Sequence, residues 1–199
     1  DDEENRDGKR PLEIEVTLYA DGKETEKKAT LTAANGWKYT FEELDKISNG
    51  TAVVYSVVEE VPNGYKAAYT TNGNTITVTN TYTTERIDIP VSKVWHDGNN
   101  QDGIRPEEIT VGLYKGEEKV AQVVLDKENA WKDVFRNLYK YENGEEIKYT
   151  IKEESVPTGY EVSVDGYVVT NTHTPETVDI SAKKVWEDFI SLVGSKKVA

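Results

Sequence analysis

The chain contains an internal repeat, and this repeat restricts its fold more than any other feature of the sequence. Four segments recur in the same order at an offset of 91 to 95 residues. An ordered repeat of this kind predicts two copies of one structural unit. The matching pairs are PLEIEVTLY (11–19) with PEEITVGLY (106–114), NGWKYTFEEL (35–44) with NAWKDVFRNL (129–138), YSVVEEVPNGY (55–65) with YTIKEESVPTGY (149–160), and ITVTNTYT (76–83) with YVVTNTHT (167–174).

Each copy has the pattern of short β-strands. Runs rich in threonine, valine, isoleucine and tyrosine alternate apolar with polar residues, as half-buried strands do. Asn-Gly pairs at 35–36, 63–64, 72–73 and 143–144 predict tight turns. Helix signals are few, and TFEELDKI at 40–47 is expected to form at most one turn. We therefore predict an all-β chain with two tandem sandwiches of about 90 residues each.

The repeat also indicates where the units begin and end. The segment VSKVW at 91–95 opens the second copy and recurs as AKKVW at 182–186, but no such segment precedes the first copy. We expect module 1 at residues 1–84, module 2 at residues 85–175 and a tail at residues 176–199. Module 1 then lacks its first strand, and the tail carries a strand of that kind at 177–186.

Composition excludes several classes of function. The chain has no cysteine, so a covalent staple cannot be a disulfide. The formal net charge of −13 argues against nucleic acid and anionic membrane surfaces as partners. No apolar run approaches the roughly 20 residues of a membrane span. A signal peptide is not recognisable, and we expect a mature fragment.

Alternation along the strands directs three polar residues of module 2 into the core. Side chains two positions apart share a face, so Lys93, Glu153 and Asn171 each point inward from a different strand. A buried charge without a partner is costly, so we expect these three groups to lie close together. Their apolar neighbours on the same faces are Ile87, Ile89, Val91, Trp95, Tyr149, Ile151, Tyr167 and Val169.

The same pattern occurs in module 1 and in the tail. Glu59 and Asn80 occupy the inward positions in module 1, and Lys184 occupies the inward position in the tail. Two interpretations are open from the residues alone. The first is a buried ion pair with a hydrogen-bonded asparagine. The second is a desolvated lysine that attacks the asparagine carboxamide, with the glutamic acid shuttling protons and ammonia leaving.

The KVW strand, NNQDGIRP, YTIKEESVPTGY and VVTNT together resemble the B-type repeats of Gram-positive collagen adhesins, the CnaB family. The resemblance covers residues 1–186. It implies reverse immunoglobulin-like sandwiches with a spontaneous Lys–Asn isopeptide bond promoted by a glutamate. It assigns Lys93, Asn171 and the catalytic Glu153 in module 2. In module 1 it assigns Asn80 and Glu59, with no lysine upstream.

The resemblance implies a structural role outside the cell. We expect a stalk repeat, anchored to the cell wall in the parent protein, with one self-modification and no enzymatic turnover. The alternatives are direct binding of a host matrix protein such as collagen, and a self-acting ligation module. The loops EENRDG at 3–8 and DGNNQDG at 97–103 are interpreted as acidic turns, because neither has calcium-loop spacing. We expect no cofactor and no metal.

The tail is expected to complete a module 1. The chain takes about six residue steps from Thr172 to Val178, and these span at most roughly 20 Å. If the modules stack end to end, the tail cannot reach module 1 of its own chain. Lys184 would then bond Asn80 of another copy, under the influence of Glu59, in a head-to-tail contact. The alternative is a fragment of a longer array with an unpaired tail.

Overall fold

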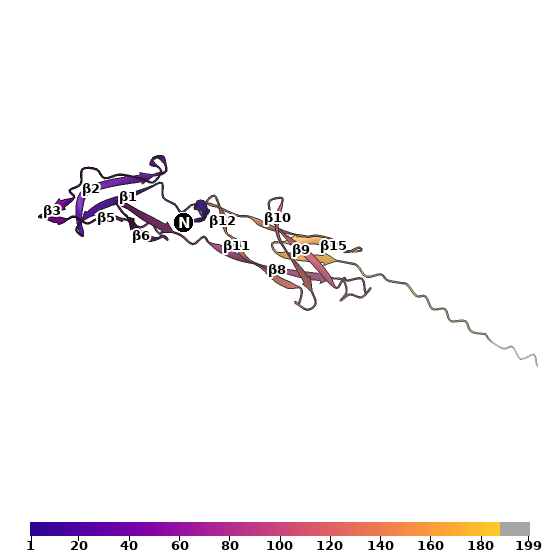
Figure 1. Cartoon of the computed structure of the whole chain (residues 1–199). Coiled ribbons are helices and arrows are strands. Elements are labelled where there is room, and N and C mark those ends of the chain that lie inside the picture. The colour runs from indigo at the N-terminus through magenta and orange to yellow at the C-terminus, as the bar shows by residue number, and fades with distance from the viewer. Residues whose placement is uncertain (188–199) are drawn as a thin grey trace, which may run out of the picture.

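The computed structural model describes residues 1–187. Modules 1 and 2 follow one another along an extended molecule, and the tail leaves module 2 on the side away from module 1 (Figure 1). Residues 188–199 of the predicted tail lie outside the described residues. None of the helices among residues 1–187 has the length and apolar character needed to cross a membrane.

Module 2 folds as two facing antiparallel-rich sheets. One sheet has the order β10-β9-β14, and the other has the order β11-β8-β16-β15, with β8 and β16 parallel. The strands are β8 (Arg86–His96), β9 (Glu108–Lys115), β10 (Glu118–Asp126), β11 (Lys132–Tyr139), β12 (Tyr141–Glu142), β13 (Glu145–Glu146), β14 (Tyr149–Glu153), β15 (Glu161–Asp165) and β16 (Val168–Thr172).

Module 1 repeats this arrangement with one position left open. The sheet β2-β1-β5 corresponds to β10-β9-β14, and the pair β6-β7 corresponds to β15-β16. The strands are β1 (Glu13–Ala20), β2 (Lys23–Thr32), β3 (Ile47–Ser48), β4 (Thr51–Ala52), β5 (Tyr55–Glu59), β6 (Lys66–Asn72) and β7 (Thr75–Thr81). Two short 3-10 helices, η1 (Glu3–Asn5) and η2 (Ala33–Asn35), complete the described elements.

The open position in module 1 is that of β8, which in module 2 lies between β11 and β16. Residues 38–45, which correspond to β11 at an offset of 94, form no strand. In module 2 this segment is a strand because it pairs with β8 from Lys132↔Ser92 to Tyr139↔Arg86. The segment 40–47, for which at most one helical turn is expected, forms none and is irregular until β3 begins at Ile47.

Module 1 buries fewer hydrophobic residues than module 2, because its first-strand position is open. Module 2 has one buried cluster with contributions from both sheets, whereas module 1 buries only Val16, Leu18 and Ala29 among its hydrophobic residues. Several side chains that match buried residues of module 2 stay half-buried in module 1. They are Ile14, Leu31, Phe41, Val57 and Val78. A first strand in module 1 would cover this apolar surface.

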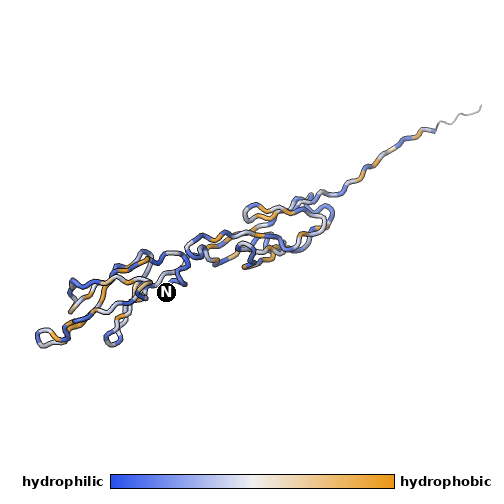
Figure 2. Tube along the Cα trace, turned by 90° about the horizontal axis from the view of Figure 1, so that it is seen from above, coloured by the Kyte–Doolittle hydropathy of each residue, from blue (hydrophilic) through white to orange (hydrophobic). Residues whose placement is uncertain are grey.

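The described part of the tail is extended and pairs with no strand of residues 1–187. Its inward-pattern side chains are exposed: Val178 by 81%, Ile180 by 89% and Trp186 by 78%. Figure 2 shows hydrophobic residues recurring along the tail as it leaves the modules. The tail therefore has the alternating sequence pattern of a strand, but its apolar side chains are not buried against a sheet.

Candidate cross-linking site

Two neighbouring strands place Lys93 and Asn171 on the same inner face of module 2. In the parallel β8–β16 ladder, Lys93 is level with Val169, and Asn171 is level with Trp95. The two polar residues are therefore diagonal neighbours, a separation that a long lysine side chain can cross. Both are buried, with Lys93 exposed by 6% and Asn171 by 0%. The predicted inward faces of β8 and β16 are confirmed.

Glu153 enters the same site from the opposite sheet, at the end of β14. Its Oε2 accepts a hydrogen bond from Lys93 Nζ at 3.2 Å, and its Oε1 accepts one from Asn171 Nδ2 at 3.1 Å. The carboxylate thus bridges the amine and the carboxamide. The side chains of Lys93 and Glu153 have no solvent exposure. The structure brings together the three residues that the sequence predicts for module 2.

The site disfavours a charged lysine. Burial lowers the pKa of Lys93 to about 8, although the nearby Glu153 carboxylate partly opposes this shift. The indole ring of Trp95 lies 4.3 Å from the Lys93 nitrogen and forms an apolar wall of the site. Asn171 Oδ1 is buried without a hydrogen-bond partner. An amine that loses its proton more readily than an exposed lysine, beside a desolvated carboxamide and a carboxyl group, is a set capable of acyl transfer.

Module 1 contains two of the three corresponding groups. Burial raises the pKa of Glu59, with a partly opposing effect from the adjacent Asn80 amide. Glu59 Oε1 and Asn80 Oδ1 are both buried without a hydrogen-bond partner. No lysine amine among residues 1–187 is paired with Glu59. The site is therefore an acid and a carboxamide beside the open strand position.

Lys184 is placed far from these residues, in the exposed tail. Its amine lies 4.1 Å from the ring of Trp186, two positions further along. The Lys93 amine and Trp95 have the same spacing in sequence and a similar separation of 4.3 Å. The tail therefore presents the same lysine and tryptophan pair as β8, outside any sheet.

The acidic loops have a structural function that the sequence reasoning did not find. Asp97 accepts hydrogen bonds from Arg105 Nε at 2.8 Å and from Tyr160 Oη at 2.9 Å, and Arg105 holds the pKa of Asp97 well below its usual range. Asp2 makes the same contacts with Arg10 and Tyr65 in module 1. The repeat could have indicated this function, because the aspartate, the arginine and the tyrosine all recur at an offset of 95.

Comparison with known proteins finds relatives that match most of the chain. The family model of the Cna protein B-type domain matches residues 1–81 and 89–172. A collagen adhesin of Staphylococcus aureus is 42% identical over 194 residues, which cover 94% of this chain and 16% of that protein. The crystal structure of two B repeat units of the collagen-binding protein of Staphylococcus aureus has a TM-score of 0.81 at 41% identity, over 88% of this chain and 47% of that one.

Proposed function

Because the chain belongs to the family of Cna protein B-type domains, we propose that it is a stalk repeat of a Gram-positive surface adhesin. The parent protein would be anchored to the cell wall, with these modules outside the cell. The chain corresponds to 16% of the length of the related collagen adhesin, so most of that relative has no counterpart here. The buried Lys93–Glu153–Asn171 set is the observation that carries the proposal, since it offers a cysteine-free chain a covalent staple.

The proposed staple is an amide between Lys93 and Asn171. The neutral Lys93 Nζ attacks Asn171 Cγ, and the electron pair of the carbonyl moves onto Oδ1. The intermediate collapses when the Cγ–Nδ2 bond breaks, and Nδ2 leaves as ammonia after it gains a proton. One C–N bond forms and one breaks, so the balance needs no oxidant and no cofactor.

Glu153 is the proposed proton carrier of this reaction. A proton can pass directly from the Lys93 ammonium to the Glu153 carboxylate, which gives a neutral amine and a neutral acid. The total number of protons is unchanged, so this transfer needs no external base. If the Asn171 carboxamide turns about its Cβ–Cγ bond, protonated Glu153 can donate to Oδ1, which has no partner at present. The carboxylate that remains takes the second proton from the attacking nitrogen and delivers it to Nδ2, which leaves as ammonia. The proton on Oδ1 returns to Glu153 when the carbonyl re-forms.

Intact mass of the purified chain tests the staple, because each amide removes the mass of one ammonia. Wild type should be lighter than its sequence mass by at least one ammonia. Lys93→Ala should lose one fewer ammonia than wild type. Peptide mapping should find Lys93 joined to Asn171. A wild-type module 2 that retains both free side chains would refute this part of the proposal.

We further propose that module 1 is completed by a strand of the type found at 177–186, supplied by a second copy of the chain. The support is the open position beside β7, the half-buried apolar side chains around it, and the exposed alternating residues of the tail. In that position Lys184 would meet Asn80 and Glu59 and form the second amide. Chains would then be joined head to tail.

A denaturing gel distinguishes the arrangements of the tail. Strand exchange between copies should give a ladder of covalent multimers that is absent in Lys184→Ala. A monomer lighter by two ammonias would indicate closure within one chain. A monomer lighter by one ammonia would show that module 1 does not react with the tail.

Collagen, which the names of the relatives mention, is proposed as a ligand of the longer parent protein and not of these modules. Within residues 1–187, the large exposed aromatic side chains Tyr39, Tyr69 and Trp186 lie in three separate segments. An aromatic groove, which would favour direct adhesion, is not part of this proposal. The modules therefore have a structural role in this proposal.

A further inference from the structure

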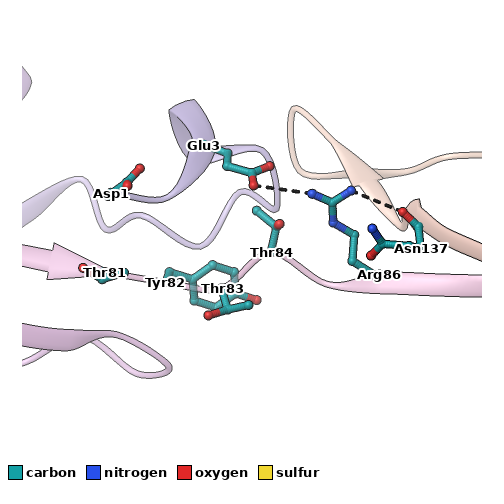
Figure 3. A pocket seen from close by; sticks show the side chains of 8 residues that line it. All are labelled: Asp1, Glu3, Thr81, Tyr82, Thr83, Thr84, Arg86 and Asn137. Atoms are coloured by element: carbon teal, nitrogen blue, oxygen red, sulfur yellow. Dashed lines mark hydrogen bonds and ion pairs between the residues drawn. The ribbon is translucent and has the colours of Figure 1, made fainter.

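Modules 1 and 2 contact each other through a specific interface, which we call the internal junction. The loop of residues 2–10 in module 1 docks on the end of module 2 that carries β11, β12 and β13. The guanidinium carbons of Arg6 and Arg86 lie 3.8 and 3.3 Å from the centre of the Tyr139 ring. Arg86 also pairs with Glu3 and donates to the Asn137 carbonyl, beside a groove of about 330 Å³ (Figure 3).

Two glycines allow the backbones to touch at this junction. The Gly144 amide donates to the Arg6 carbonyl at 2.9 Å. A Cβ on Gly8 would lie 2.7 Å from the Gly144 Cα, and a Cβ on Gly144 would lie 3.2 Å from the Gly8 Cα. Both residues have a positive φ, which glycine adopts without strain. The close approach therefore depends on a glycine in the loop of module 1 and a glycine in the β12–β13 hairpin of module 2.

The repeat places counterparts of both glycines at the free ends of the described structure. Gly103, in the corresponding loop of module 2, has a φ of +71°, and Gly50, in the β3–β4 hairpin of module 1, has a φ of +79°. Neither has any atom within 4 Å of a Cβ built on it. The hairpin lies at the far end of module 1, and the tail leaves from the opposite end of the molecule (Figure 1). The two ends thus carry the two complementary parts of the internal junction.

The chain leaves module 2 in the same way that it leaves module 1. Asp7 Oδ2 accepts the Glu85 amide at 2.6 Å, and Asp102 Oδ2 accepts the Glu176 amide at 2.9 Å. Residues 7 and 102 are related by the repeat, as are residues 85 and 176. The first contact directs the chain into β8 of the next module. The second contact directs residues 177–186 along the corresponding path.

We propose that the loop 97–105 of module 2 docks on the β3–β4 hairpin of a second copy of this chain, in the geometry of the internal junction. The docking surface is the Gly103 turn on one copy and the Gly50 turn on the other. This contact is non-covalent and does not require Lys184 to react. The docking contact would align the two copies for the proposed strand exchange.

The contact between copies is weaker than the internal junction, because its charged and aromatic groups differ. Gln101 stands where module 1 has Arg6, and Asp45 stands where module 2 has Tyr139. The Arg6 guanidinium is therefore replaced by a neutral amide, and the aromatic ring on which it stacks is replaced by a carboxylate. The backbone approach of the two glycines is retained. We expect transient association that favours one relative orientation.

Cysteine cross-linking tests the orientation directly, because the chain has no cysteine of its own. Ser48→Cys and Gln101→Cys correspond to Glu142 and Arg6, whose side chains approach to 3.8 Å at the internal junction. The two single variants are mixed with a short bismaleimide. Both carry Ile180→Asp and Lys184→Ala, which prevent strand entry and amide formation.

The control mixture replaces Ser48→Cys by Asp165→Cys, in the exposed β15–β16 turn. The matched pair should give mixed cross-linked dimers at least about tenfold faster than the control, because docking raises the local concentration of the two thiols. Adding Gly103→Val should remove this advantage, whereas Gly166→Val, at an equally open positive-φ turn, should not. Equal rates in the two mixtures, or no effect of Gly103→Val, would overturn the inference.

This result is independent of the covalent proposal. A wild-type chain that forms the Lys184-dependent ladder while the matched cysteine pair shows no preference would leave strand exchange intact and refute docking. The converse, preferential cross-linking without any ladder, would support docking alone.

Discussion

Glu153, the last residue of β14, and Glu154, which follows it, point in opposite directions and provide a matched pair of variants. Glu153 is buried between Lys93 and Asn171, whereas Glu154 faces outward and pairs with Lys119 at 3.1 Å. Glu153→Gln should preserve the shape of the site but prevent proton transfer, so the ammonia loss of module 2 should disappear. Glu154→Gln should retain it. Intact mass measures both outcomes.

Loss of the staple should also lower the stability of module 2. The amide closes a loop of about 78 residues, which in the chain-entropy model contributes about 4–5 kcal/mol to the free energy of unfolding. Glu153→Gln should therefore unfold at a lower denaturant concentration than Glu154→Gln. If Glu153→Gln still loses ammonia at this site, Glu153 is not the proton carrier.

His173 gives the exit from module 2 a pH dependence that the exit from module 1 lacks. Its Nε2 lies 2.9 Å from Asp102 Oδ2, and its Nδ1 lies 2.8 Å from the Gly159 carbonyl oxygen. Both partners are acceptors, so the doubly protonated ring satisfies both contacts. The neighbouring Asp97 carboxylate and the Tyr160 ring, 5.4 Å away, complete its surroundings. Residue 82 at the equivalent position is a tyrosine.

The pKa of His173 is raised, first by the Asp102 hydrogen bond and then by the Gly159 carbonyl. A base with a raised pKa in the folded state stabilises the fold at low pH, and this contribution is lost as the pH rises through the folded pKa. The melting temperature of wild type relative to His173→Tyr should therefore fall between about pH 6 and pH 8. Parallel melting curves of the two proteins across this range would contradict the prediction.

At the level of strands, the alternating pattern predicted which residues face the core, and it failed where the outcome depends on a partner strand. Lys93, Glu153 and Asn171 could be assigned because period-2 alternation fixes the face of each strand. The segment 40–47 could not, because its local composition favours a helical turn, whereas its counterpart β11 becomes a strand only through pairing with β8. Module 1 has no counterpart of β8, so segment 40–46 forms neither a helical turn nor a strand.

The junction was also beyond sequence reasoning. Arg6, Arg86 and Tyr139 come from three segments with no common period, and their stacking follows from how two modules meet. The repeat could indicate that the acidic loops are equivalent, but not that one of them docks on a hairpin of the next module. Contacts between modules leave no periodic signal.

The open edge of β7 leads to a prediction that uses an isolated strand. A synthetic peptide of residues 176–187 should insert beside β7 and couple to Asn80 when mixed with the Lys184→Ala chain. The apolar face of the peptide would cover the half-buried side chains of module 1, and its lysine would reach Glu59 and Asn80. Mass spectrometry should show the summed mass minus one ammonia.

Two controls accompany the peptide experiment. Asn80→Ala in the chain should bind the peptide without coupling, since the acyl group is absent. A peptide with Ile180→Asp should neither bind nor couple, because a charge replaces an inward apolar side chain. Coupling that persists in Asn80→Ala would show that the amide forms elsewhere.

At the level of the whole molecule, the internal junction should hold the two modules in one relative orientation. Tyr139→Ala removes the ring between Arg6 and Arg86 and should widen the distribution of distances between spin labels on cysteines at Thr30 and Glu161, exposed positions in modules 1 and 2. Arg136→Ala, which removes a largely exposed side chain, is the control. A distribution unchanged by Tyr139→Ala would show that the linker alone orients the modules.

The parallel pairing of β8 with β16 determines how module 2 would carry a mechanical load. The chain enters at the start of β8 and leaves at the end of β16, so tension slides the two strands along each other. The ladder from Val168↔Ser92 to Thr172↔His96 is then loaded in shear, and its hydrogen bonds share the force. With Lys93 joined to Asn171, the residues between them lie outside the loaded path. In force spectroscopy the stapled module should lack the extension of about 260 Å that this segment would otherwise release, so that tension is transmitted through it at nearly constant length.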